Sequence, residues 1–222
     1  MTTTTVLAQD PDELFDVVDE RGRPTGETRR RADVHRDGDW HCAVHVWIIG
    51  IDGDEPFILF QRRSSDKDTW PDLLDATAAG HLRAGESVAG ALREIEEELG
   101  IVPDLTALRH FGTRACVSAP QHDRIDRELQ EVFLLRDDRP LDAYSPAIAE
   151  VAALARFRLD PLLALFAGDR DHAPATLLDA ATGTTTNTDV PLAAFIPTTD
   201  NYFARVAIAA RAALRGEAHV AL

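Results

Sequence analysis

The stretch Gly80–Ile101, GHLRAGESVAGALREIEEELGI, constrains the fold of this chain more than any other. A glycine-containing loop leads into a predicted helix over 88–99, where apolar residues recur every three or four positions, as they do on the buried stripe of an amphipathic helix. This stripe consists of Val88, Leu92, Ile95 and Leu99. The sequence therefore predicts one helix that packs on a core.

Three carboxylates share another face of the same predicted helix. Glu94, Glu97 and Glu98 follow the i, i+3, i+4 spacing in the C-terminal half, where the helix dipole is negative. Like charges at this spacing cost roughly 0.2–0.5 kcal/mol per pair. Arg93 can offset part of this cost by pairing with Glu97, and Mg²⁺ or Mn²⁺, which prefer carboxylate oxygens, can offset the rest. A solvated acidic face is the alternative that EIEEEL alone favours.

The spacing of the whole stretch resembles the Nudix box. Gly80, five residues and Glu86 precede the second half of the motif, which reads Arg93-Glu94-Ile95-x-Glu97-Glu98-x-Gly100-Ile101. Only six residues separate Glu86 from Arg93, where the family has seven, so the junction between loop and helix must absorb one deletion. The resemblance implies an α/β (α+β) fold, a Nudix-type α/β/α sandwich around a mixed β-sheet.

The resemblance also implies roles for individual residues. Glu94, Glu97 and Glu98 would hold Mg²⁺ or Mn²⁺ and, with Arg93, form the catalytic set. Glu94 or a loop carboxylate would help to activate water, while Gly80 and Glu86 would shape the substrate loop. Glu128 and Glu131, before the apolar segment VFLL, are candidates for a further metal-binding carboxylate, and each could also be an ordinary surface residue.

Composition narrows the class of protein. The chain has 222 residues, 45% of them hydrophobic, and a net charge of −15, which argues against binding to a nucleic-acid backbone. Its start, MTTTTVLAQD, lacks a secretory signal, its longest apolar run is too short to span a bilayer, and two cysteines make no disulfide framework. We therefore expect a cytoplasmic protein that binds a small-molecule diphosphate, with no nucleic-acid or membrane partner. A homodimer is compatible with the sequence.

The rest of the chain indicates three segments: a polar tail over 1–12, a Nudix domain over 13–168 and a C-terminal extension over 169–222. Strands are predicted at 14–18, 41–49, 57–60, 76–79, 108–118, 130–135 and 151–159, and a helix at 161–166. Polar loops are predicted at 121–127 and in TGTTTNTD (182–189). Thr199 or Asp200 should cap a last helix that ends before Gly216.

Outside the box, LFDVVDERGRPTG and HVWII resemble the branch of Nudix proteins similar to isopentenyl-diphosphate isomerase. In that enzyme two cations hold the substrate diphosphate, and Arg63 and Lys67 fall on their positions. Its metal site is rich in histidine and glutamate. Three of its ligand positions correspond to His41, His81 and Glu128 here, and His35 is one residue out of step with a fourth. We also predict that His81 lies against the substrate. A structural role is the alternative for each of these residues. The basic patch Arg29 to Arg31 is predicted to be a solvated turn, and phosphate binding is its alternative.

Two departures from the isomerase favour a hydrolase. The essential cysteine of the isomerase is Ala79 here, so a key acid–base group is absent, and the chain keeps the hydrolase glutamates Glu94 and Glu97. We therefore predict a metal-dependent pyrophosphohydrolase that cleaves the phosphoanhydride bond of a nucleoside-diphosphate-type or other organic diphosphate. The alternatives are an isomerase of isoprenyl diphosphates and a non-catalytic nucleotide- or metabolite-sensing module.

Overall fold

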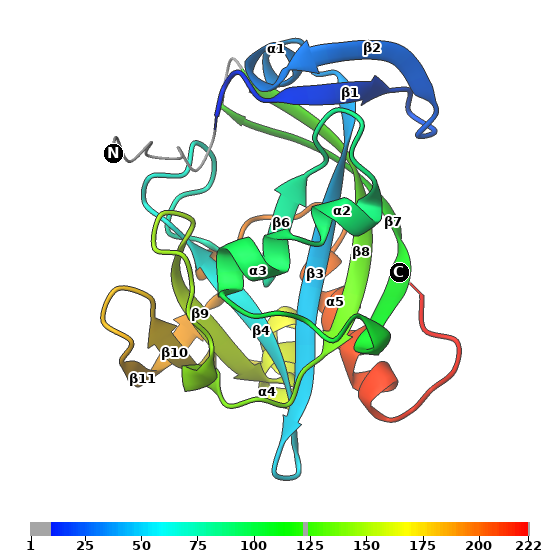
Figure 1. Ribbon diagram of the computed structural model, residues 1–222. Helices are drawn as coiled ribbons and strands as arrows, with labels where there is room; N and C mark the ends of the chain where they lie inside the picture. The colour runs from blue at the N-terminus through cyan, green and yellow to red at the C-terminus, as the bar shows by residue number, and fades with distance from the viewer. Residues whose placement is uncertain (1–9, 122–123, 222) are drawn as a thin grey trace.

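The computed structural model describes residues 10–121 and 124–221. Within them, eleven strands form one mixed sheet whose main path runs β11-β10-β9-β4-β3-β1-β2. Strand β3 (Trp40–Asp52) is central, because it pairs in parallel with β8 (Arg124–Arg136) and antiparallel with β4 (Glu55–Arg63) and β6 (Ala78–His81). Its 13 residues are rich in β-branched and aromatic side chains, and most of them are buried. The strand runs through the middle of the ribbon in Figure 1.

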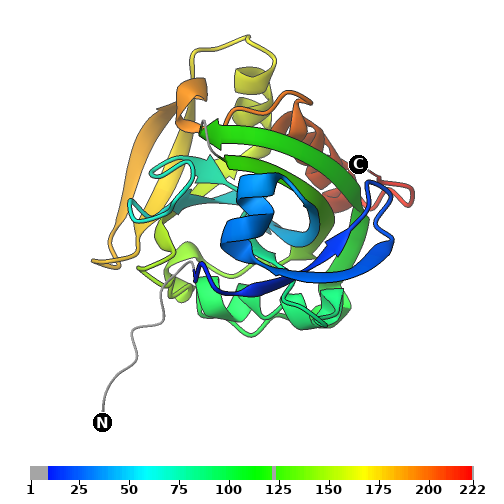
Figure 2. The same cartoon turned by 90° about the horizontal axis from the view of Figure 1, so that it is seen from above.

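The remaining strands complete the sheet around this centre. The ribbon of β1 (Leu14–Val18) and β2 (Pro24–Arg30) lies at one end with α1 (Arg31–Asp37), as Figure 2 shows from above. Strand β5 (Leu74–Asp75) pairs with β4, β7 (Leu108–Gln121) pairs with β8, and β9 (Val151–Arg158) joins β4 to the hairpin of β10 (His172–Asp179) and β11 (Thr185–Pro191). Short 3₁₀ turns lie at Leu105–Ala107, Leu141–Ala143 and Leu192–Ala194.

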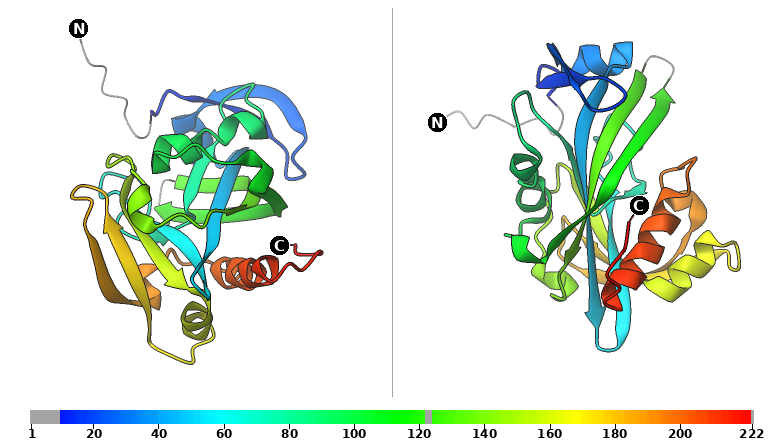
Figure 3. Two further views of the ribbon diagram at one scale, coloured as in Figure 1. Left: turned by 60° about the horizontal axis from the view of Figure 1, so that its bottom comes forward. Right: turned by 90° about the vertical axis from the view of Figure 1, so that its right-hand side faces the viewer.

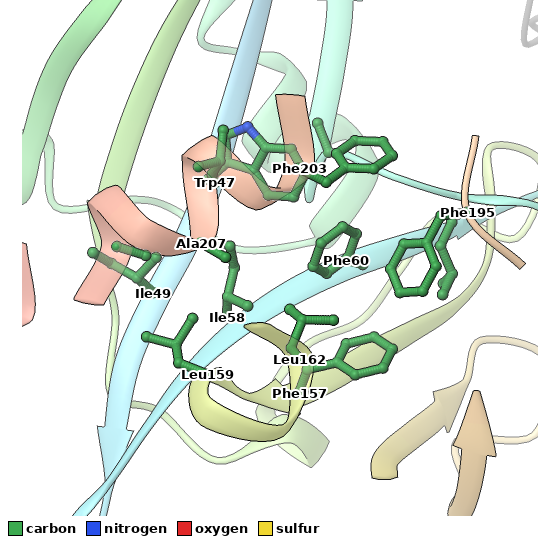
Figure 4. Packing of buried hydrophobic residues seen from close by; sticks show 14 of the residues in the cluster. Trp47, Ile49, Ile58, Phe60, Phe157, Leu159, Leu162, Phe195, Phe203 and Ala207 are labelled. Carbon is green, nitrogen blue, oxygen red and sulfur yellow. The ribbon is translucent and has the colours of Figure 1, made fainter. Parts of the chain in front are cut away.

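Helices cover both faces of the sheet, which confirms the predicted α/β/α sandwich (Figure 3). The segments α2 (Val88–Ala91) and α3 (Glu94–Leu99) lie on one face, and α4 (Leu159–Phe166) and α5 (Tyr202–Leu214) lie on the other. On the α5 face, the rings of Trp47, Phe60 and Phe203 pack edge to face (Figure 4). On the α3 face, Leu92, Ile95 and Leu99 are buried with Val46 and Ile48. No helix in the described residues is long and apolar enough to cross a membrane.

Two loop predictions and a cap prediction were wrong. Most of the segment predicted as a loop at 182–189 belongs to β11, an edge strand whose threonines suit extended backbone although its side chains are almost all exposed. Residues 124–127 of the predicted polar loop begin β8, while 122–123 lie outside the described residues. Asp200 does not cap α5, because Asn201 adopts a left-handed φ of 54° and the Asp200 carboxylate pairs with Arg114 instead.

The C-terminal extension is part of the fold rather than an appendage. Strands β10 and β11 extend the sheet, and α5 buries Phe203, Val206 and Ala210 in the core. As predicted, Gly216 follows the last helix with a positive φ of 79°. The predicted tail over 1–12 lies mostly outside the described residues. The domain boundaries themselves stay a prediction.

Candidate active site

A pocket of about 1030 Å³ lies where β6, β3 and β8 meet α3, α1 and the segment before α5. Strand β6 separates two groups of side chains within it. Gly80 faces α3, whereas Ala79 and His81, its neighbours in the strand, pair with His45 and Ala43 of β3 and so face the other side of the sheet. The box carboxylates, Glu94, Glu97 and Glu98, all line the pocket from the α3 side.

Gly80 is required by the close approach of Glu94. A Cβ atom at position 80 would lie 2.3 Å from the carboxyl carbon of Glu94, far inside van der Waals contact. Only glycine therefore lets the carboxylate of Glu94 reach the edge of β6. The structure thus places the first residue of the box against one of its glutamates.

The predicted single helix over 88–99 is interrupted. Leu92 and Arg93 form a turn between α2 and α3, and the amides of Arg93, Ile95 and Glu96 donate to carbonyls three residues earlier rather than four. A 3₁₀-type turn rises further per residue than an α-helix, so it spans the same length with fewer residues. We attribute the break to the residue missing between Glu86 and Arg93, because the junction lies between these two positions.

Arg93 holds the acidic residues of the box together. Its Nε donates to Glu86 Oε1 at 3.0 Å, and its Nη1 contacts Glu94 and donates to Glu97 Oε2 at 2.9 Å. The ion pair with Glu86 forms despite the shortened spacing. The guanidinium therefore offsets repulsion among these three carboxylates and fixes their orientation.

Glu98 is the most deeply buried of the box carboxylates, with 2% of the residue exposed. Its Oε2 accepts from the backbone amide of Ala79 at 3.0 Å and lies 3.4 Å from Gln61 Nε2. Burial raises the pKa of Glu98 to about 8, although the charge of nearby Lys67 opposes the rise, and burial raises the pKa of Glu94 to about 7. A cation beside either carboxyl group would therefore stabilise its charged form.

The two cations predicted to hold phosphate line the pocket, but protein groups already engage them. Lys67 forms an ion pair with Glu150 and lies 4.0 Å from Glu98 Oε1. Arg63 donates to the carbonyl of Thr69 at 3.0 Å and pairs with Asp75 at 3.2 Å, so it also braces the loop after β4. Glu150, which lines the pocket, was missed from the sequence; its place just before the predicted strand at 151–159 was the available signal.

A second group, the histidine cluster, lies on the α5 face of β6. It consists of His35, His41, His81, Asp126 and Glu128. Ligand atoms of the three histidines and Asp126 all lie within 4.8 Å of one another, and His81 Nε2 lies 2.9 Å from Glu128 Oε1. Helix α1 supplies His35, β3 and β6 supply His41 and His81, and β8 supplies both carboxylates.

Three buried atoms of the histidine cluster lack hydrogen-bond partners in the described structure. They are Nε2 of His35, Nε2 of His41 and Oδ1 of Asp126, and they face each other, because the two nitrogens lie 3.8 and 3.5 Å from the oxygen. Unpaired buried polar atoms are costly, so a shared ligand is expected between them. A set of imidazoles and carboxylates fits Mn²⁺ or another divalent transition metal.

Electrostatics keep these histidines in the form that binds metals. Burial, reinforced by the charge of Arg31, lowers the pKa of His35 to about 2 and of His81 to about 3. Arg31 Nη1 lies 3.0 Å from His81 Nδ1. Burial beside Glu128 also raises the pKa of Asp126. At neutral pH the imidazoles are therefore neutral, as metal ligation requires.

Some site residues were unexpected and one candidate is elsewhere. Asp126 was missed, although it precedes Glu128 by two positions and therefore shares its face of a strand. Arg31 starts a helix that was not predicted and is buried, rather than part of a solvated turn. Glu131 lies outside the pocket and pairs with His110 at 2.6 Å and Thr113 at 3.0 Å. Glu128 lies in the histidine cluster rather than among the box carboxylates.

Comparison with known families identifies the family of this chain. The family model of the NUDIX domain matches residues 40–177, which include the box and the chain from β3 to within β10. The chain belongs to the Nudix family. This confirms the resemblance of the box and makes the protein a Nudix-type pyrophosphohydrolase, an enzyme that hydrolyses diphosphate bonds. Enzymes of this family generally use divalent metal ions.

Individual relatives agree with the family. A Clostridium acetobutylicum protein described as an uncharacterized Nudix hydrolase is 33% identical over 153 residues, which are 68% of this chain and 72% of the relative. Nudix hydrolase 3 of Arabidopsis thaliana is 39% identical over 64% of this chain but only 19% of its own length. Isopentenyl-diphosphate Delta-isomerase of Rhizobium rhizogenes is 36% identical over 51% of this chain and 54% of its own.

The same fold occurs among solved structures. A crystal structure of a Deinococcus radiodurans protein aligns with a TM-score of 0.50 at 22% identity. The alignment covers 70% of this chain and 90% of that protein. At this level of identity the likeness supports the fold alone.

Proposed function

We propose that this protein is a Mg²⁺- or Mn²⁺-dependent hydrolase of a nucleoside-diphosphate-type or other organic diphosphate. The observation that carries the proposal is the convergence of the box carboxylates and Glu150 on one end of the pocket, beside Lys67. An all-oxygen donor set is what Mg²⁺ and Mn²⁺ prefer, and the raised pKa values of Glu94 and Glu98 show that burial leaves their charges in need of a cation.

The residues of the chain would divide the work as follows. Glu94, Glu97 and Glu98 would hold the ions, and Arg93 would keep the first two oriented through its ion pairs. Lys67 and Arg63 would contact the diphosphate, with Gly80 and His81 in the surrounding wall. Glu86, predicted to contact the substrate, does not line the pocket and would act through its ion pair with Arg93. The bound ions supply Lewis acidity at the phosphate oxygens. Glu94, with a pKa of about 7, or the loop carboxylate Glu150 would accept a proton from the attacking water.

A hydrolysis assay on chelator-treated protein, with the products separated by anion-exchange chromatography, tests this function. Chromatography is needed because nucleotide sugars and dinucleotides yield phosphomonoesters rather than free phosphate. Purified protein would be supplied with Mg²⁺ or Mn²⁺ and offered nucleoside di- and triphosphates, nucleotide sugars, dinucleotides and isoprenyl diphosphates. We expect hydrolysis of at least one compound, loss of activity with EDTA, and recovery when metal is returned. If no diphosphate in the panel is cleaved with either metal, the proposed function is wrong.

The histidine cluster and the similarity to isopentenyl-diphosphate isomerases favour isomerisation as a second candidate. Against it, Ala79 occupies the position of the essential cysteine, so the side chain that should move a proton at the double bond is a methyl group. We expect no interconversion of isopentenyl and dimethylallyl diphosphate at an enzymatic rate. Robust interconversion by the wild-type protein would replace the hydrolase proposal.

We also propose a cytoplasmic location and a homodimer, both of which remain predictions. The two cysteines of the chain, Cys42 and Cys116, are free, as a reducing compartment would allow. Size-exclusion chromatography with light scattering would establish the assembly state.

A further inference from the structure

The part of the pocket behind Ala79 carries a hydrogen-bonding group that the proposed chemistry does not use. His45 pairs with Ala79 across β3 and β6, so both side chains face the side of the sheet that α5 covers. The His45 side chain lines the pocket and is 7% exposed. Tyr202 and Phe203, at the start of α5, close the pocket over it.

The position of the His45 ring is fixed by Tyr202. His45 Nδ1 lies 3.2 Å from the Tyr202 hydroxyl, and Trp47 Nε1 donates to the same oxygen at 2.9 Å. The Tyr202 ring is held in turn by Arg114, whose guanidinium carbon lies 4.0 Å from the ring centroid and whose nitrogens pair with Asp200. The hydroxyl and both rings that contact it are therefore fixed before any ligand binds.

This arrangement assigns the tautomer of His45. The indole of Trp47 can only donate, so the Tyr202 oxygen accepts that bond and its own proton needs an acceptor. His45 Nδ1 is within reach as that acceptor, and burial lowers the pKa of His45, so the ring is neutral. A neutral imidazole that accepts at Nδ1 carries its proton on Nε2. In the described part of the chain, His45 Nε2 has no hydrogen-bond partner.

We infer that His45 Nε2–H donates a hydrogen bond to the organic part of the substrate, and that this part carries an acceptor such as a carbonyl, hydroxyl or ring nitrogen. The inference rests on the proposed function, because it assumes that the diphosphate lies beside the box carboxylates on the other side of Ala79. A branched hydrocarbon in this space would leave the Nε2 proton buried without a partner. We expect a buried donor left unpaired to cost roughly 10- to 100-fold in affinity, which is about 1.4–2.8 kcal/mol at 1.4 kcal/mol per tenfold.

Variants of His45 test this inference. His45→Leu removes the donor, while His45→Gln keeps an N–H donor of similar reach. With an adenosine-containing diphosphate as the polar substrate, we expect His45→Leu to lower kcat/KM by 10- to 100-fold through KM, and His45→Gln to recover most of the loss. Hydrolysis of geranyl diphosphate should stay unchanged or rise in His45→Leu. Tyr202→Phe, which frees the tautomer but keeps the ring, should lower kcat/KM for the polar substrate by a smaller factor.

A binding measurement separates this inference from the proposed function. Calorimetric titration with adenosine 5′-(α,β-methylene)diphosphate needs no turnover, and its affinity should fall 10- to 100-fold in His45→Leu. Binding that depends on His45 in a protein that cleaves no diphosphate would support the inference and reject the hydrolase. Cleavage that prefers geranyl diphosphate in the wild type, or equal losses for both substrates in a folded His45→Leu protein, would overturn the inference and leave the hydrolase standing.

Discussion

The box carboxylates and the histidine cluster face one pocket from opposite sides of β6, but the chain stabilises them differently. Arg93 contacts Glu94 and Glu97, while Glu98 has the amide of Ala79 and lies near Lys67. The box therefore has cations of its own. Without metal, the carboxylates of the box repel one another, but each of them has a partner in the protein.

The histidine cluster lacks such internal compensation. Its cationic neighbour, Arg31, contacts His81 and disfavours protonation of the imidazoles, and three buried ligand atoms face each other without hydrogen bonds. Until a cation binds, the neutral imidazoles and the unpaired oxygen of Asp126 contribute little stabilising free energy to one another. From this comparison we propose that a metal bound at the box would serve mainly turnover, whereas a metal bound at the histidine cluster would serve mainly stability.

The largest expected effect is on turnover at the box. Glu98→Gln keeps the size of the side chain but removes its charge, and we expect a fall in turnover of at least about 100-fold, because electrostatic stabilisation of the transition state depends on this charge. Glu96→Gln is the matched control, since Glu96 is an exposed residue of the same helix outside the pocket lining. Steady-state product formation at saturating metal, followed by chromatography, would measure both. Wild-type turnover in Glu98→Gln would show that the proposed catalytic centre is wrong.

The next effect concerns metal-dependent stability at the histidine cluster. A ligand present at 100 times its Kd stabilises a protein by about 2.7 kcal/mol, which corresponds to roughly 5–10 °C for a chain of this size. His41→Ala should lose much of the rise in Tm that Mn²⁺ produces, while Glu98→Gln should keep more of it. His110→Ala, whose ring pairs with Glu131 outside the pocket, is the control. If Mn²⁺ raises the Tm of His41→Ala as much as that of the wild type, the histidine cluster is not the site at which Mn²⁺ stabilises the protein.

These two regions also differ in how far the sequence predicts them. The box is contiguous, so its spacing in the sequence was enough to place Arg93 against the glutamates, although it did not reveal the break at Leu92. The histidine cluster joins segments that are far apart, and the parallel pairing of β3 with β8, which brings His41 beside Glu128, has no local signal. The same pairing brings Asp126 to the cluster, and the pairing of β9 with β4 brings Glu150 to the box carboxylates, so the local signals of these two residues did not show which site they join. Strand β11 was missed because an edge strand exposed on both faces shows no apolar alternation.

A smaller effect is the pH dependence of the metal-free protein. Burial raises the pKa of Glu94 to about 7 and of Glu98 to about 8, so the folded state binds more protons than the unfolded state from about pH 4.5 upward. Stability should therefore fall as pH rises through this window. The lowered pKa values of four histidines act in the opposite sense, and this effect fades as pH rises past their unfolded value of about 6.5; they are His35, His41, His45 and His81.

Between pH 6.5 and 8 the raised carboxylates, which include Asp126, should outweigh the fading contribution of the histidines. We expect a loss of about 1–2 kcal/mol across this interval in chelator-treated protein, measured by urea unfolding. Glu98→Gln should flatten most of the slope, and Mg²⁺ should flatten it in the wild type. A metal-free wild type that becomes more stable from pH 6.5 to 8 would contradict the assignment of the raised pKa values.

The smallest effect separates two adjacent members of the box. The Glu97 side chain is 49% exposed and pairs with Arg93 four residues before it, whereas Glu98 is buried. An exposed pair of this kind contributes roughly 0.3–0.5 kcal/mol, and removing the Glu97 charge also relieves repulsion with Glu94. These opposing terms are similar in size, so Glu97→Gln should leave metal-free stability at pH 8 within about 0.5 kcal/mol of the wild type. Glu98→Gln should raise it, because the buried charge is gone. Urea unfolding of both variants at pH 8 would measure the difference. A gain in Glu97→Gln as large as that in Glu98→Gln would mean that mutual repulsion, rather than burial, raises the pKa of Glu98. The number of negative charges in the metal-free box, rather than the burial of Glu98, would then lower its stability.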